Sequence, residues 1–289
     1  MWPEGNAKPL AWVIPAVTGR PRPTSCSKTR STERAVGAPG SCENPAVEAT
    51  FVLVHGGGHG GWCWQRVARR LRERGAEVYT PTLTGFGERS HLDVSTVTFE
   101  TFVTDVVNVF RFEDLRDVVL VGHSMGGVIV PRVAEAVPDR IRRVVWLAGA
   151  VTADGESLIE AVPQSPWIAR AVTLGPDGTA HTDPDLVLDA NIHDGTPEER
   201  AFVRERHLPY PPHALVEPGR LTAFLALGLP TGYVTALDDR TIEPAVCARF
   251  VARLPGCLAL EVGGGHDCMI TRPDEVTDAL VTMAGVPAG

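Results

Sequence analysis

The fold is decided by the stretch VVLVGHSMGGVIV (118–130), in which two apolar segments flank the pentapeptide GHSMG (122–126). The first segment is rich in β-branched residues and predicts a strand that is buried on both faces. The second segment predicts a helix. A GxSxG sequence between a strand and a helix is typical of a sharp turn, because only very small residues fit two positions either side of the serine. The pattern indicates that Ser124 is a nucleophile held on such a turn.

Apolar runs and helical patterns alternate along the chain from Ala49 onward. Strands that alternate with helices form a parallel sheet covered by helices on both faces. We therefore predict an α/β fold with a mostly parallel central sheet. Strands are expected at 49–56, 77–81, 117–122, 142–150, 230–237 and 257–262, and helices at 62–75, 99–110, 124–137, 242–254 and 272–285.

Two long segments break this alternation and define the predicted domain organisation. Residues 1–48 contain seven prolines and no apolar period, so they cannot bury enough apolar area to offset the entropy of ordering. We predict that they form an irregular, Pro/Ser-rich extension. Residues 152–228 are too long for a plain loop between two core strands and predict a cap insertion. The α/β core is then formed by residues 49–151 and 229–289.

The composition excludes several classes of protein. A formal net charge of −8 without a basic cluster argues against nucleic-acid binding, and no apolar run reaches the roughly 20 residues of a membrane-spanning helix. Both lysines, Lys8 and Lys28, lie in the first thirty residues, so the core has none for a Schiff base or a phosphate-binding loop. Six cysteines without a CxxC pair and a start without a basic signal segment predict reduced thiols and a cytoplasmic protein.

A serine hydroxyl needs a base to accept its proton and an acid to orient that base. His266 follows the last predicted strand in a glycine-rich loop, and Asp238 and Asp239 follow the strand before it. The chain order Ser, Asp, His fits a serine held on this kind of sheet. Either aspartate satisfies the order, and Asp267, which directly follows His266, is expected to be a solvated turn residue.

The loop HGGGH (55–59) follows the first strong strand and brings small residues to the same edge of the sheet. Backbone N–H groups of such a loop can approach a developing oxyanion. The loop also starts a GxGxxG sequence (56–61), with Glu77 about twenty residues on, as in a dinucleotide site. Trp62 and Trp64 oppose that alternative because they crowd the place of a pyrophosphate, and Glu77 would begin a strand instead of ending one.

Several sequence blocks together resemble the α/β-hydrolase superfamily. Within it, the chain is similar to the esterase/hydroxynitrile-lyase group, which includes plant methylesterases and related bacterial esterases. The resemblance covers about residues 50–285. The matching blocks are FVLVHGGGHGGWCWQRV (51–67), TPTLTGFGERSHL (80–92), VVLVGHSMGG (118–127), DRTIEP (239–244) and GGGHDCMITRP (263–273).

This resemblance implies a role for each candidate residue. In the group, the acid stands three residues before the apolar residue that opens the next helix, which is Ile242 here, and this selects Asp239 over Asp238. His59 and the tryptophans of the first block match the group as scaffold residues. The catalytic residues implied are Ser124 as nucleophile, His266 as base and Asp239 as acid, with the backbone N–H groups of Gly57 and Met125 as oxyanion donors.

The expected reaction is hydrolysis of a small-molecule carboxylic ester through an acyl-enzyme, with neither a metal nor an organic cofactor. Trp167 and Tyr210 in the insertion are the expected substrate-binding residues. A hydroxynitrile lyase is the main alternative, but lyases of the group carry Thr and Lys at the positions of Gly56 and Asp267. Hydrolysis of a lactone or thioester and a non-catalytic binding role remain open. Aspartate-dependent hydrolases of this fold are disfavoured by Ser124.

Overall fold

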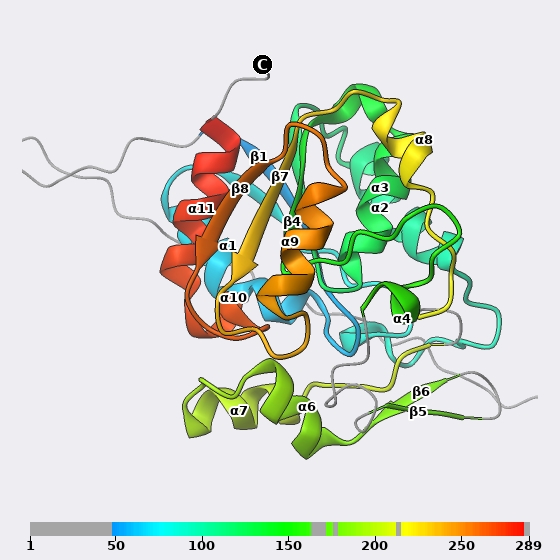
Figure 1. The fold of residues 1–289 in the computed structure, drawn as a ribbon, viewed down its shortest axis with the longest axis vertical. Coiled ribbons are helices and arrows are strands. Elements are labelled where there is room, and N and C mark those ends of the chain that lie inside the picture. Colours follow the sequence, from blue (N-terminus) through cyan, green and yellow to red (C-terminus); the bar gives the residue numbers. More distant parts are fainter. Residues whose placement is uncertain (1–47, 163–171, 176–178, 212–214, 286–289) are drawn as a thin grey trace, which may run out of the picture. The chain divides into compact units, whose positions relative to one another are not determined.

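Six parallel strands form the central sheet of the computed structural model, in the order β2-β1-β3-β4-β7-β8 (Figure 1). The structure describes residues 48–162, 172–175, 179–211 and 215–285. The predicted extension 1–48, apart from its last residue, and Trp167 therefore lie outside the described residues. The strands are β1 (Thr50–Val54), β2 (Glu77–Tyr79), β3 (Val118–His123), β4 (Ile141–Leu147), β7 (Thr231–Ala236) and β8 (Leu258–Val262).

The central strands are apolar throughout because both faces of the sheet are covered. In β1, Val52 and Val54 belong to the core on one face, whereas Phe51 and Leu53 belong to the core on the other face. Side chains alternate in this way because successive residues of a strand point to opposite faces. The two cores that result explain why the sequence shows continuous apolar runs and no alternation with polar residues.

Helices cover both faces of the sheet (Figure 1). On one face α1 (Gln65–Glu73) packs against α11 (Pro273–Gly285). On the other face α2 (Phe99–Phe112) packs against α3 (Gly126–Ala136), and α9 (Pro244–Ala252) contributes Phe250 to the same core. The predicted α/β fold with a mostly parallel sheet is confirmed.

The predicted insertion contains more regular structure than its sequence indicates. A two-stranded antiparallel hairpin is formed by β5 (Val172–Leu174) and β6 (Ala180–Thr182). In Figure 1, α6 and α7 lie beyond the carboxyl end of β7. Ser124 directly follows the carboxyl end of β3, which runs parallel to β7 in the same sheet. The helices in the described part of the insertion are α4 (Leu158–Ala161), α6 (Pro184–Asn191), α7 (Pro197–Arg204) and α8 (Leu221–Leu225).

Short helical segments complete the described structure. The 3-10 helices are η1 (Gly61–Trp64), η2 (Gly87–Arg89) and η3 (Pro138–Arg140), and α10 (Cys268–Thr271) links the last strand to α11. No helix in the described part of the chain is long and apolar enough to cross a membrane. The four described cysteines are not paired with one another; they are Cys63, Cys247, Cys257 and Cys268.

Candidate active site

Ser124 lies on the turn between β3 and α3, with φ of 51°. That value lies in the left-handed region, which non-glycine residues rarely adopt and which is often found at functional sites. The turn is tight on both sides. A Cβ at Gly122 would lie 2.6 Å from the carbonyl oxygen of Gly126, and one at Gly126 would lie 2.8 Å from that of His55. Both glycines of the pentapeptide are therefore required by close backbone contacts.

The backbone of the turn is held from two directions. The Ser124 carbonyl accepts hydrogen bonds from the N–H of Gly127 at 2.9 Å and from the N–H of Ala150, in the loop after β4, at 3.0 Å. The indole N–H of Trp146 donates to the Gly127 carbonyl at 2.8 Å. These contacts fix the unusual conformation of Ser124 before any substrate binds.

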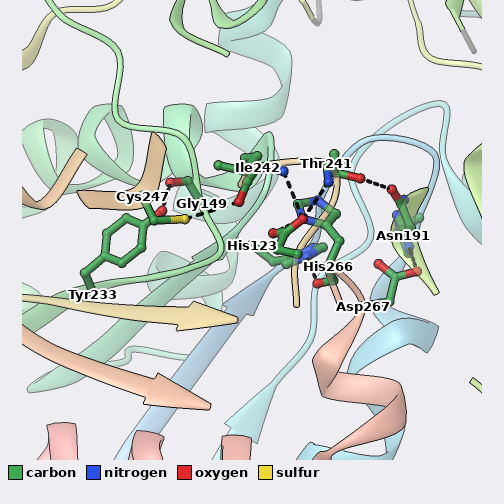
Figure 2. Close-up of polar contacts among 11 residues, drawn as sticks. His123, Gly149, Asn191, Tyr233, Thr241, Ile242, Cys247, His266 and Asp267 are labelled. Carbon is green, nitrogen blue, oxygen red and sulfur yellow. Dashed lines mark hydrogen bonds and ion pairs between the residues drawn. The ribbon is translucent and has the colours of Figure 1, made fainter. Parts of the chain in front are cut away.

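His266 and Asp239 form a buried pair at the ends of β8 and β7. The Nδ1–H of His266 donates to Asp239 Oδ2 at 2.7 Å. The other oxygen, Oδ1, accepts from the backbone N–H groups of Thr241 at 2.7 Å and Ile242 at 2.9 Å (Figure 2). With its Nδ1 proton engaged, the neutral His266 ring carries its acceptor lone pair on Nε2. It is therefore in the tautomer that a general base requires.

The two candidate aspartates have different surroundings. Asp238 is exposed, and its Oδ2 accepts from the backbone N–H of Gly264 at 3.2 Å. Asp239 is buried and contacts the His266 ring. The structure thus brings Asp239, and not Asp238, to His266.

The loop that follows β1 lies directly against the serine. A Cβ at Gly56 would lie 2.7 Å from the Cβ of Ser124. Gly58 has φ of 73°, so the backbone turns back on itself at this point. The loop does not lead into the helix start that a dinucleotide site needs, because η1 intervenes before α1, and Glu77 begins β2.

The segment after α7 covers this loop. The Tyr210 ring lies over Gly57, where an added Cβ would meet its Cε2 and Cζ at 2.8 Å, and the His207 ring occupies the space beside Gly58. The backbone N–H of Leu208 donates to the Gly58 carbonyl at 3.0 Å. Of the two residues expected to bind substrate, Tyr210 is therefore found next to the expected oxyanion donor.

Met125 precedes the first residue of α3, and its side chain is buried. Its N–H belongs to the amino end of that helix, where backbone donors are free of intrahelical partners and the helix dipole favours negative charge. Gly57 and Met125 therefore lie on the two segments, the loop after β1 and the start of α3, that adjoin Ser124.

The expectation that Asp267 is a solvated turn residue is wrong. Its side chain is fully buried, and its Oδ2 lies 3.2 Å from Nε2 of His59, which is also buried. Burial alone would raise the pKa of Asp267, but the charge and hydrogen bond of His59 outweigh burial and lower it to about 2. Burial opposes protonation of His59 too, yet Asp267 raises the His59 pKa. The sequence could not reveal the pair because its members are 208 positions apart.

Two other histidines are buried around the site and neutral. His55 donates through Nδ1 to the Gly56 carbonyl at 2.7 Å and accepts at Nε2 from the N–H of Leu83 at 3.0 Å. His123 donates from Nε2 to the His266 carbonyl at 3.0 Å, and its ring centre lies 4.7 Å from that of His266 (Figure 2). Among the residues that the structure describes, no three His, Cys, Asp or Glu side chains could hold a metal ion together.

A parallel α/β sheet with a serine on a strand-to-helix turn and a His–Asp pair at the ends of the last two strands defines a class of protein. The chain belongs to the α/β hydrolase family, whose model matches residues 51–279. The resemblance seen in the sequence is thereby confirmed.

Individual relatives agree with this assignment. The chain is 34% identical over 244 residues to a carbendazim-hydrolysing esterase of Nocardioides sp. strain SG-4G, covering 81% of this chain and 99% of that protein. It is 27% identical over 260 residues to a pyrethroid hydrolase of Sphingobium wenxiniae, covering 82% and 88%. An extracellular α/β-hydrolase from a Paenibacillus species superposes with a TM-score of 0.70 at 26% identity, covering 81% and 98%. That hydrolase is described as sharing structural and functional homology with tobacco salicylic acid binding protein 2.

Proposed function

We propose that this protein is a serine esterase that hydrolyses a small-molecule carboxylic ester through an acyl-enzyme. The observation that carries the proposal is the buried hydrogen bond of 2.7 Å between His266 and Asp239, since it leaves His266 Nε2 as the base for Ser124. The names of two relatives, a carbendazim-hydrolysing esterase and a pyrethroid hydrolase, support the class of carboxylic ester hydrolase.

In the first half of the reaction, Ser124 Oγ attacks the ester carbonyl carbon while His266 Nε2 takes its proton. The new imidazolium is stabilised by Asp239, whose second oxygen is held by two backbone N–H groups. The N–H groups of Gly57 and Met125 bind the oxyanion of the tetrahedral intermediate. The intermediate collapses when His266 returns the proton to the leaving alcohol, and an acyl-serine remains.

In the second half, water takes the place of the alcohol. His266 accepts a proton from the water as its oxygen attacks the acyl carbon, and the same two donors bind the second oxyanion. Collapse of this intermediate releases the carboxylic acid and returns the proton to Ser124. None of these steps uses a metal or an organic cofactor.

The insertion 152–228 is proposed to act as a cap over this chemistry. Tyr210 supports this role because its ring covers Gly57 next to the serine. Substrate groups attached to the ester carbonyl would then contact the Tyr210 ring. Replacing Tyr210 by Ala should therefore change the preference for acyl or alcohol size more than it changes turnover of the smallest ester.

The proposal is tested with Ser124→Ala and a panel of esters that vary in acyl length and alcohol size, together with a methyl carbamate (carbendazim), a lactone and a thioester. The wild type should hydrolyse at least one member, the variant none, and a fluorophosphonate should label Ser124 alone. Activity that survives in Ser124→Ala, or labelling of another residue, would refute a serine mechanism. A wild type that binds but turns over no member would favour the non-catalytic alternative.

A further inference from the structure

Behind the Gly57 peptide lies a second buried His–Asp pair that the proposed reaction does not use. His59 Nδ1 lies 2.7 Å from the Gly57 carbonyl oxygen, and His59 Nε2 lies 3.2 Å from Asp267 Oδ2. The side chains of both residues are at most 1% exposed. A pair buried this deeply is costly to desolvate and calls for a specific role.

The partners of His59 determine its charge. A carbonyl oxygen only accepts, so Nδ1 must carry a proton to bond Gly57; an ionised carboxylate also only accepts, so Nε2 must carry one to bond Asp267. A histidine with both nitrogens protonated is an imidazolium. His59 therefore makes two charge-assisted hydrogen bonds, a class that is stronger than neutral hydrogen bonds; the one to the Gly57 carbonyl, at 2.7 Å, is also short. One of them ends on the peptide group of the loop that lies against Ser124.

We propose that His59 and Asp267 are positioning residues for the oxyanion hole: Asp267 keeps His59 charged, and His59 holds the Gly57 carbonyl so that the loop presents the Gly57 N–H toward the oxyanion. This inference rests on the proposed serine mechanism. Residues 56–58 are all glycine, so the segment depends on such bonds for its conformation. His55 holds the Gly56 carbonyl and the N–H of Leu208 holds that of Gly58, while the Gly57 carbonyl is held by His59. Glycine loses more conformational freedom than any other residue when it is fixed.

The other groups around His59 leave Asp267 as its counter-ion. The ring of His123 lies 5.8 Å from it and that of His207 5.6 Å, and His55 is close enough to repel its charge. Burial first, and then neighbouring histidines, lower the pKa of each of these three, to about 3 for His55 and His207. All three are neutral near pH 7, so the charge of His59 depends on Asp267.

The test compares Asp267→Asn with the matched variant Asp238→Asn, an exposed aspartate on a neighbouring loop. The readouts are kcat and KM for an ester that the wild type hydrolyses, and the inhibition constant of a trifluoromethyl ketone, which forms an oxyanion on the serine. Asp267→Asn should lower kcat about 10- to 100-fold, below the cost of deleting an oxyanion donor outright. It should change KM less than threefold. It should raise the inhibition constant of the ketone by the same factor by which kcat/KM falls. Asp238→Asn should change all three constants less than threefold.

Two further results are expected from a positioning role of the His59–Asp267 pair and not from a purely structural one. In Asp267→Asn, His59 should lose its proton within the working pH range, so kcat should rise toward acid pH through an ionisation that the wild type lacks. His59→Gln should lower kcat similarly, and His59→Gln combined with Asp267→Asn should lose no more than about threefold beyond the worse single variant, since residues that act as one unit are not additive. If Asp267→Asn fails to fold, His59→Gln alone carries the kinetic test.

The outcomes separate this inference from the proposed function. If the ketone inhibits the wild type but binds equally well to folded Asp267→Asn or His59→Gln, the positioning role is refuted and the serine mechanism stands. A rise in KM with kcat unchanged, in either variant, also refutes the positioning role. If the ketone does not inhibit the wild type and Ser124→Ala stays active, the proposed function itself fails.

Discussion

His123 donates a hydrogen bond of 3.0 Å to the backbone carbonyl of His266, which joins the turn that bears Ser124 to the loop that bears its expected base. The two residues come from the ends of β3 and β8, which are not neighbours in the sheet. The bond therefore sets the distance between serine and base across the intervening strands β4 and β7. In the described part of the chain, the other nitrogen of His123 has no hydrogen-bond partner.

Replacing His123 by Phe should displace the His266 loop while it keeps an aromatic ring in the buried site. We expect kcat to fall about 10-fold or more, because a shift of about 1 Å at a catalytic group can cost up to about 100-fold. The unfolding free energy should fall by about 1–3 kcal/mol, since the His266 carbonyl loses its buried donor. His91→Phe, at an exposed histidine, is the control and should leave both quantities unchanged. A fully active His123→Phe variant would show that the bond does not position His266.

The aspartate pair offers a direct comparison of neighbouring side chains. Asp239→Asn should lower kcat by roughly three orders of magnitude or more while the fold stays intact, as expected for the acid of a serine triad. Asp238→Asn should change it by less than about threefold, because its carboxylate bonds a backbone N–H and not His266. Steady-state kinetics of both variants on one ester decide the matter. Equal losses would mean that neither residue acts alone as the acid.

Hydroxynitrile cleavage should be absent. Departing cyanide needs a positive group beside the base, and at that position the chain has Asp267, whose charge is neutralised by His59. A threonine at position 56, as in lyases, would also place its Cβ 2.7 Å from that of Ser124 unless the loop moved. Purified protein should release no cyanide from mandelonitrile above the uncatalysed rate. Release that Ser124→Ala abolishes would make the lyase the correct assignment.

Acid should destabilise the fold through its buried neutral histidines. Burial lowers the pKa of His55 to about 3 and that of His123 well below the usual value, whereas both take up a proton near pH 6.5 when unfolded. Stability therefore falls as pH drops below 6.5, by about 1.4 kcal/mol per pH unit for each histidine. His59 acts in the opposite direction because its pKa is raised, and its contribution is present below pH 6.5 and lost at high pH. His207, whose pKa burial lowers to about 3, acts in the same direction as His55 and His123. Below pH 6.5 His59 is protonated in both the folded and the unfolded state and adds no slope, so the net expectation is a loss of about 4 kcal/mol per pH unit from the three neutral histidines.

Urea unfolding followed by tryptophan fluorescence between pH 7 and 5 measures this slope. The variant His123→Phe removes one of the three histidines, so its slope below pH 6.5 should be shallower than that of the wild type by about 1.4 kcal/mol per pH unit. A wild-type stability that does not change between pH 7 and 5 would contradict the assignment of neutral, buried histidines.

The sheet could be predicted from sequence because its strands carry their own signal. The apolar run at 49–56 contains β1 (Thr50–Val54), and the helical spacing from Phe99 to Phe110 lies within α2. The hairpin of β5 and β6 was not predicted, since three-residue strands in a Pro-rich segment show no measurable period. The extension 1–48 and the cap role of 152–228 stay predictions.

The site was only partly predictable, because some of its features are local in the sequence and others are contacts between distant residues. Glycine spacing marks the turn at Ser124, and position after a strand marks Asp239 and His266, because these features are local. The burial of Asp267 depends on His59, which no local pattern associates with it. An acidic residue next to a glycine-rich loop is typical of solvent exposure, and only the three-dimensional contact reverses that expectation.

The 208 positions between His59 and Asp267 also have a consequence for biosynthesis. At a ribosomal rate of about 5–20 residues per second, the chain between them takes about 10 to 40 seconds to be made. Late in that interval the loop after β1 and the serine turn are already outside the ribosome, but the loop lacks its anchor and the serine lacks its base. Hydrolytic activity should therefore appear only when the last strand and helix have emerged. Every fragment that ends before residue 266 should be inert, however much of its sheet has formed.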